Sequence, residues 1–149
     1  MLVGKICNRE VVFVEPESSI TQAAQLMRTH HVGGLVVARE KSGKRVPVGI
    51  VTDRDIVLEV IAEGVEMNDI SVGDIMSNRL VTARESDDLL DTIKIMRARG
   101  IRRLPVIDDD GALAGILTVD DLIELFAEQL GDLARLIALE QKREQEARK

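Results

Sequence analysis

The sequence is almost without aromatic residues. It contains no Trp and no Tyr, and its two aromatic side chains are Phe13 and Phe126. Proteins that bind single-stranded nucleic acid stack bases on such rings, and contacts with phosphates favour a basic surface. This chain instead has a formal net charge of −6. Both features argue against a nucleic-acid partner.

Cysteine is also scarce, and long hydrophobic runs are missing. Cys7 is the single cysteine, so no disulfide can form within the chain. We interpret it as a small apolar residue rather than a nucleophile. No apolar run has the length of a membrane span, and the segment from Met1 to Val14 lacks the pattern of a signal peptide. We therefore expect a cytoplasmic protein without a membrane partner.

Catalytic and metal-binding patterns are absent from the sequence as well. His30 and His31 are adjacent, so on a helix they would point in different directions and make a poor metal pair. The run Asp108-Asp109-Asp110-Gly111 has its glycine in the wrong place for a calcium loop and predicts a hairpin turn instead. No nucleophile triad and no phosphate-binding or dinucleotide-binding glycine loop occurs. The sequence predicts no enzyme activity, no catalytic residues, no metal site and no required cofactor.

What the sequence does contain is an internal repeat. The segment Gly-Ile-Val-Thr-Asp-Arg-Asp-Ile at 49–56 returns as Gly-Ile-Leu-Thr-Val-Asp-Asp-Leu at 115–122, and residues 27–37 line up with residues 96–106. A unit repeated once predicts two copies of one fold rather than a solenoid. Each copy of about 60 residues would be marginally stable alone, so we expect the two to share a core.

Each copy has the pattern strand, helix, strand, strand, helix. Ser19 and Gln22 have the spacing of a capping box before the first of these helices. One such unit cannot cover both faces of its sheet, so we predict a mixed α/β fold (α+β) in which two units face each other about an approximate twofold axis. Alternation, helical spacing and turn residues place the elements at 11–14, 20–29, 32–38, 46–52 and 53–63, and again at 80–83, 89–99, 101–107, 113–118 and 119–130.

The last part of the chain, 131–149, is a predicted helical tail. It begins with an apolar stripe that includes Leu133, Leu136 and Ile137, and it ends in charged residues. We expect its start to dock and its end to fray. The stripe is too short to predict a sustained coiled coil, and a partner-binding role stays open.

The repeated Thr-x-x-Asp motif is the main candidate for chemistry. Thr52 with Asp55, and Thr118 with Asp121, each follow a strand and open a helix, where outward-pointing backbone amides favour an anion. The hydroxyl could hold a phosphate, and the carboxylate could accept two hydrogen bonds from a ribose. The same spacing is that of a capping box, which needs no ligand. Both interpretations stay open, because a capping Thr can also bind phosphate.

The chain resembles a tandem pair of CBS domains, the Bateman module, over nearly all of 3–130. The resemblance rests on residues 49–56, on Val-Gly-Asp-Ile-Met at 72–76, and on Ile-Arg-Arg-Leu-Pro-Val at 101–106 before Gly-Ile-Leu-Thr at 115–118. It implies a stand-alone protein of bacterial or archaeal type with two β-α-β-β-α repeats related by a pseudo-twofold axis. The expected domains are a first repeat at 1–70, a second at 71–130 and a C-terminal charged helix at 131–149.

The resemblance also implies an adenosine-containing ligand in a cleft between the repeats. In the family, the Asp of the motif binds ribose and the Thr approaches phosphate or ribose, while aliphatic side chains and main-chain groups hold the base. Such a pocket would explain how a chain without Trp or Tyr holds a purine. The implied ligand-binding residues of this sequence are Thr52, Arg54, Asp55, Thr82, Arg102, Arg103, Leu104, Pro105, Ile116, Thr118 and Asp121.

Arginine side chains are the expected phosphate ligands. Arg54 is the first candidate, because it lies inside the motif at the mouth of the helix. Arg102 and Arg103 follow, at the start of a strand. For all three, the alternative is a solvated surface charge.

The two copies of the repeat are not equivalent. The first has Gly33-Gly34 where the second has a basic pair, and the second has Asp120, which would repel a phosphate, where the first has Arg54. We therefore expect one occupied site and one empty site. The sequence favours the site of Thr118 and Asp121, assisted by Arg54.

The predicted function is that of a regulatory, energy-sensing module that binds an adenosine-containing nucleotide: AMP, ADP, ATP, NAD or S-adenosylmethionine. The ligand would shift the relative orientation of the repeats, and an unknown effector protein would respond to that change. The resemblance implies a homodimer. The alternative is a ligand-free structural or dimerisation module that regulates a partner protein, in which the two Thr residues are caps only.

Overall fold

The computed structural model describes residues 1–148 of the chain. They divide into two compact units, Met1–Leu117 and the segment that begins at Thr118. The helices and strands are α1 (Val3–Ile6), β1 (Phe13–Val14), α2 (Ile20–His30), β2 (Gly34–Lys41), β3 (Lys44–Thr52), α3 (Asp53–Ile56), η1 (Val57–Ile61), η2 (Met67–Asp69), α4 (Val72–Ile75), β4 (Ala83–Arg84), α5 (Leu89–Arg99), β5 (Arg103–Ile107), β6 (Leu113–Thr118) and α6 (Val119–Ala147). The predicted mixed α/β fold is confirmed.

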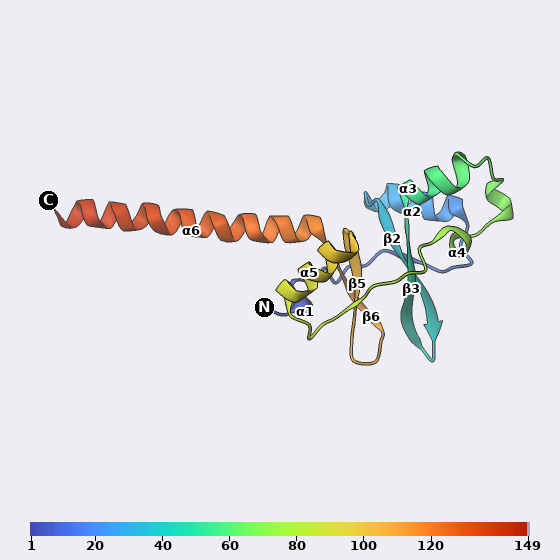
Figure 1. Cartoon of the computed structure of the whole chain (residues 1–149), viewed down its shortest axis with the longest axis horizontal. Coiled ribbons are helices and arrows are strands. Elements are labelled where there is room, and N and C mark those ends of the chain that lie inside the picture. The colour runs from blue at the N-terminus through green and yellow to red at the C-terminus, as the bar shows by residue number, and fades with distance from the viewer. Residues whose placement is uncertain (149) are drawn as a thin grey trace. The chain divides into compact units, whose positions relative to one another are not determined.

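Each repeat contributes one three-stranded sheet. The strand order is β1-β2-β3 in the first sheet and β4-β5-β6 in the second. Figure 1 shows β2 beside β3 and β5 beside β6. β1 runs parallel to β2, and β4 runs parallel to β5, whereas β2 and β3 form an antiparallel hairpin. At the hairpin turn, Ser42 and Gly43 have φ angles of 53° and 75°, the left-handed backbone that a two-residue turn requires. The strands predicted at 11–14 and 80–83 are reduced to the short β1 and β4.

Local signals place the two longest helices of the first unit accurately. α2 begins with the predicted capping box: the Gln22 N–H donates to Ser19 Oγ over 3.0 Å, and the Ser19 N–H donates to Gln22 Oε1 over 2.9 Å. α5 covers the predicted residues and ends at Gly100, whose φ of 64° stops the helix. Helical spacing and capping residues therefore decided these elements.

The core of the first repeat is aliphatic. Its buried residues come from α2, all three strands of the first sheet, and the helical segments that follow, and the largest fully buried ones include Ile20, Leu35 and Val51. Leu89, Leu104 and Leu117 are the corresponding fully buried residues of the second repeat. This composition explains how a chain with so few aromatic residues builds its interior.

The repeats exchange short segments. The α1 residues Val3 and Gly4 donate backbone hydrogen bonds to Asp87 and Glu85 of the second repeat. Conversely, Val72 and Gly73 of α4 donate to Ser18 and Pro16 of the first repeat. This exchange of α1 and α4 joins the two sheets through the backbone.

The glycine that opens each copy of the repeated motif is required by this exchange. A Cβ at Gly49 would lie 2.6 Å from the carbonyl oxygen of Ser77, and a Cβ at Gly115 would lie 2.7 Å from Cys7 Sγ. Both distances are too short for a side-chain carbon. The segments that follow α1 and α4 therefore lie directly against the strands that carry the motif.

Two helices differ from the prediction. The helix expected at 53–63 is α for its first turn and then widens to a π-helix, η1. The tail expected to begin at 131 is continuous with the preceding helix, because α6 runs unbroken from Val119 to Ala147. Gly131 costs an exposed helix only about 1 kcal/mol, so a single glycine between good helix formers does not end it.

No helix among residues 1–148 combines the length and the apolar character needed to cross a membrane.

Candidate functional site

The first copy of the motif forms a complete capping box. The Asp55 N–H donates to Thr52 Oγ1 over 3.1 Å, and the Thr52 N–H donates to Asp55 Oδ2 over 2.9 Å. The cap interpretation of this motif is therefore correct. It leaves the Thr52 hydroxyl hydrogen unused by the cap, because the oxygen acts as an acceptor.

The second copy of the motif is capped on one side only. The Asp121 N–H donates to Thr118 Oγ1 over 3.2 Å. In the part of the chain that the structure describes, the Asp121 carboxylate makes no return bond to the Thr118 N–H. Both residues belong to the second unit. The two copies of one sequence motif thus differ in how their carboxylates are used.

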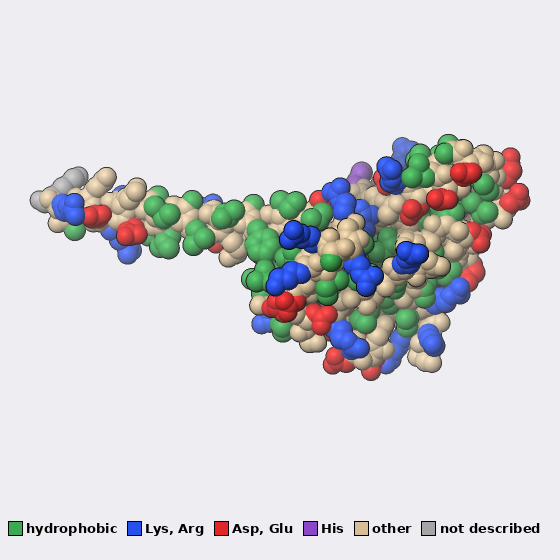
Figure 2. All heavy atoms as spheres, viewed as in Figure 1, with side chains coloured by type: hydrophobic (Ala, Val, Ile, Leu, Met, Phe, Trp, Pro, Cys, Tyr) green, Lys and Arg blue, Asp and Glu red, His purple; other side chains and the backbone are tan. Residues whose placement is uncertain are grey.

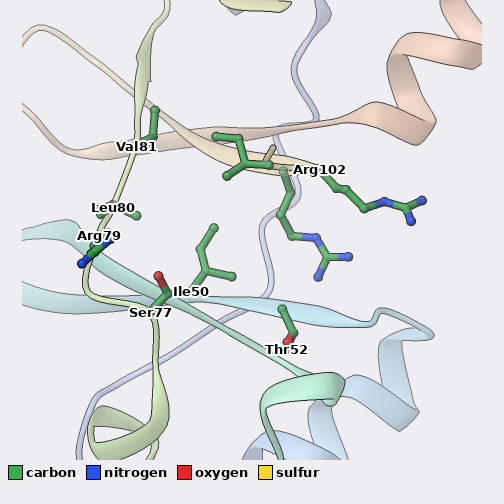
Figure 3. Close-up of a pocket in the computed structure, with 9 residues that line it drawn as sticks. Ile50, Thr52, Ser77, Arg79, Leu80, Val81 and Arg102 are labelled. Carbon is green, nitrogen blue, oxygen red and sulfur yellow. The ribbon is translucent and has the colours of Figure 1, made fainter. Parts of the chain in front are cut away.

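A pocket of about 200 Å³ lies at the end of β3 in the first unit. Figure 3 shows Ile50, Thr52 and Ser77 on one side of the hollow and Arg102 on the other, with Arg79, Leu80 and Val81 along the segment that joins the sheets. The lining combines four aliphatic side chains, two hydroxyls and three guanidinium groups, and no carboxylate. The lining residues are Ile50, Thr52, Ser77, Arg79, Leu80, Val81, Ile101, Arg102 and Arg103.

Arg103 is the most unusual residue of this pocket. Its Nη1 atom is buried and has no hydrogen-bond partner among residues 1–148. The guanidinium lies so close to Gly34 that a Cβ on that glycine would overlap it. Gly34 pairs with Thr52 in the β2–β3 ladder, so the guanidinium is held near the strand end where the Thr52 hydroxyl lies.

The surface around this region is basic. Figure 2 shows Lys and Arg side chains gathered on the visible face over α5, β5 and β3. Arg79 and Arg102 are exposed, and Arg103 is half-buried. The chain is acidic as a whole, so this concentration of positive charge is local and would attract a small anion.

The pocket brings together some of the predicted site residues and not others. Thr52, Arg102 and Arg103 line it. Asp55 does not line the pocket, but it is hydrogen-bonded to Thr52, which does. Arg54 and Thr82 are exposed, and neither of them lines the pocket.

The remaining predicted residues lie elsewhere. Leu104 and Pro105 are buried in β5. Ile116 of β6 exchanges backbone hydrogen bonds of 2.9 Å with Asn8. Each of these three residues therefore has a structural role in its sheet.

Sequence reasoning missed six of the lining residues. Ile50 precedes the Thr of the motif by two positions. Ser77 and Arg79 lie between the elements predicted at 53–63 and 80–83, and Leu80 and Val81 begin the second of these. The sequence did contain one signal for this part of the pocket: Arg79, a possible phosphate ligand, directly precedes the apolar residues Leu80 and Val81. Ile50 and Ser77 meet through an isolated bridge, which only the exchange of α4 produces. The sixth residue is Ile101.

Metal-binding side chains do not gather in the described part of the chain. No three His, Cys, Asp or Glu side chains among these residues could hold a metal ion. Cys7 is buried, and that burial raises the pKa of its thiol above the usual value.

Phe13 packs against Arg45, whose guanidinium carbon lies 3.7 Å from the ring centroid.

Comparison with known protein families identifies the repeated unit. The family model of the CBS domain matches the chain twice, at residues 3–62 and 72–128. The chain belongs to the CBS domain family. As a CBS pair, it has the fold of a regulatory module, and the family resemblance inferred from its motifs is confirmed.

Relatives of this CBS pair occur in several settings. A protein of Methanopyrus kandleri, MK0525, is 36% identical over 123 residues, which are 83% of this chain and 61% of that protein. The inosine-5'-monophosphate dehydrogenase of Thermoplasma acidophilum is 36% identical over 115 residues, 77% of this chain but only 21% of the enzyme. The chain thus spans less than two thirds of both, and the match to the dehydrogenase is a match to one part of that enzyme.

The chain is also similar to solved structures, one of which contains ligands. The CBS domain pair of protein MJ0100 is 27% identical and superposes with a TM-score of 0.74, covering 87% of this chain and 98% of that one. It was solved in complex with 5'-methylthioadenosine and S-adenosyl-L-methionine.

Proposed function

We propose that this CBS pair is a regulator that binds a phosphorylated adenosine nucleotide in the pocket between Thr52 and Arg103. The observation that carries the proposal is the buried Nη1 atom of Arg103, which has no hydrogen-bond partner among the described residues. A buried donor left without a partner costs about 1–3 kcal/mol. A phosphate oxygen is a partner that would remove this cost, and it fits the planar guanidinium well.

The charge of the lining favours phosphate over a positively charged ligand. Arg79, Arg102 and Arg103 line the pocket, and no carboxylate does. MJ0100 binds two adenosine derivatives, one of which carries a sulfonium. Both of these ligands contain adenosine, which supports an adenosine ligand for this chain as well. The three arginines would attract the phosphates of AMP, ADP, ATP or NAD and would repel the sulfonium of S-adenosylmethionine.

The rest of the pocket suits an adenosine. Ile50, Leu80, Val81 and Ile101 offer an apolar slot for the base that needs no aromatic ring. The free hydroxyl hydrogen of Thr52 can donate to a ribose or phosphate oxygen. At about 200 Å³, the pocket is smaller than most ligand sites, so the phosphates would extend towards the exposed arginines.

The position of the pocket suggests how binding could be sensed. It takes residues from β3 of the first sheet, from β5 of the second, and from the segment between them. A ligand that contacts both sheets stabilises one relative arrangement of them over others. We propose that a separate effector protein responds to this change and that the regulator is a homodimer.

Co-purified ligand and binding assays test the proposal. Because the chain has no Trp or Tyr, a band near 260 nm in the purified protein would report bound nucleotide directly. In titrations, Arg103→Ala should weaken ADP binding by roughly ten- to a hundredfold, the value of a hydrogen bond to a charged group. It should leave adenosine binding nearly unchanged. Arg99→Ala, an exposed arginine of α5 outside the pocket, is the matched control.

A ligand-free structural module is the second candidate function. The observation that favours it is the complete capping box of Thr52 and Asp55, which explains that motif without a ligand. This function would be supported if millimolar AMP, ADP, ATP and NAD all failed to bind the folded wild type.

A further inference from the structure

Helix α6 carries an apolar face that its own unit leaves uncovered. Ile123, Phe126, Leu130, Leu133 and Ile137, here called the α6 stripe, are 63%, 40%, 67%, 57% and 57% exposed. Figure 2 shows hydrophobic side chains along this helix. An uncovered apolar face of this extent is typical of an interface.

The spacing of the α6 stripe indicates what kind of surface covers it. Its residues are alternately three and four positions apart, the repeat that keeps one seam facing a second helix along its length. The flanking positions Ala127, Gln129 and Ala134 are small or uncharged. Leu136, also exposed at 60%, widens the seam. The required partner is therefore another helix.

Charged residues lie away from the seam. Glu124, Glu128 and Arg135 occupy the other side of α6 in this register, and Arg135 pairs with Asp132 on that same side over 3.2 Å. The first charge at a seam position is Glu140. Charges beside a seam set the choice and orientation of the partner through interhelical salt bridges or like-charge repulsion. Their absence here means that two copies can pair without like-charge repulsion.

The α6 stripe extends beyond the repeat that defines the family. The CBS match ends at residue 128, so Leu130, Leu133 and Ile137 follow it. This part of the seam lies outside the two matched CBS repeats. A surface that is complementary to itself forms a twofold interface between identical chains.

We infer that the α6 stripe pairs with the α6 stripe of a second copy of this chain, as a short coiled coil. Covering two stripes removes about 1,000 Å² of surface from water, at roughly 100 Å² for each large side chain. That area reaches the lower limit of a specific interface. The helix pairing is therefore the element that holds the dimer together.

Light scattering and sedimentation equilibrium of the full chain test this inference. The wild type is expected to be dimeric, and Leu130→Glu/Leu133→Glu should have half its mass at the same concentration. Ala138→Glu/Gln145→Glu adds the same charge at exposed positions off the seam and should keep the mass of the wild type. Circular dichroism and nucleotide binding verify that each variant is folded, and Ile137→Asn is the milder variant if the double one unfolds.

Two results would overturn the inference. One is a wild type that stays monomeric at high micromolar concentration. The other is a folded seam variant whose mass equals that of the wild type, which would assign the dimer to a different face. Neither result bears on the pocket, because binding is measured separately.

Discussion

At the scale of single residues, the pocket depends on a pair that the sequence keeps far apart. Arg103 can lie where it does because residue 34 has no side chain. In the sequence, Gly33-Gly34 is only the place where the first repeat lacks the basic pair of the second. In the structure this difference has a steric consequence: the glycine of one repeat makes room for the arginine of the other. Asymmetry between the copies thus contributes to a cationic pocket.

Gly34→Ala tests this relation. The new Cβ would displace the Arg103 guanidinium, which is the mobile end of a long side chain, so the fold should survive. ADP binding should weaken about tenfold, because the charged hydrogen bond is misplaced. In a double-mutant cycle, Gly34→Ala should have little further effect on ADP affinity in the Arg103→Ala background. Additive losses measured by calorimetry would contradict the pairing.

At the scale of elements, the strands that carry the motif are locked by segments from elsewhere in the chain. The residues after α4 bond to β3, where the Ser77 N–H donates to the Ile50 carbonyl over 2.9 Å. The residues after α1 bond to β6 in the same way, through Asn8 and Ile116. The glycines at 49 and 115 allow these close approaches, which explains why each copy of the motif begins with glycine.

Gly49→Ala should therefore be destabilising. Its Cβ would meet the Ser77 carbonyl oxygen at 2.6 Å, and this backbone atom cannot move without disturbing the bridge. We expect a loss of about 1–3 kcal/mol in the free energy of unfolding, the usual cost of overpacking. Gly131→Ala is the control, because nothing lies within 4 Å of a Cβ there and Ala favours the helix by up to about 1 kcal/mol. Urea denaturation compares them, and equal stabilities of Gly49→Ala and wild type would refute the argument.

At the scale of the whole molecule, duplication has produced two sheets of the same strand order, but the two copies of the motif differ in their hydrogen bonds. The pocket described here takes Thr52 from the first copy of the motif and Arg102 and Arg103 from the second repeat. The sequence favoured the second copy, Thr118 and Asp121, for the ligand. We now propose the first copy, since its Thr lies in the pocket that holds the unpartnered arginine.

This asymmetry predicts one phosphorylated ligand per chain. Isothermal titration calorimetry with ADP should give a stoichiometry of one, and the complex at 100 times Kd should be stabilised against unfolding by about 2.7 kcal/mol. Arg103→Ala should remove most of this stabilisation. Two equivalents of ADP bound with equal affinity would show that the copies have not diverged in this way.

The sequence alone determined the duplicated mixed α/β architecture, the bounds of α5, the start of α2, the Ser19 and Thr52 caps and the family. These features follow from signals within a few residues: helical and strand periodicity, capping pairs and a short repeated motif. Only the tertiary structure decided that α1 and α4 exchange, that Ile50 meets Ser77, and that Arg103 lies over Gly34. Each of these joins residues distant in the chain, and spacing along a sequence does not encode which distant surfaces meet. The continuity of α6 through Gly131 is a local feature that the sequence analysis nevertheless did not predict. The small cost of one glycine in a helix is outweighed by the good helix formers on either side of it.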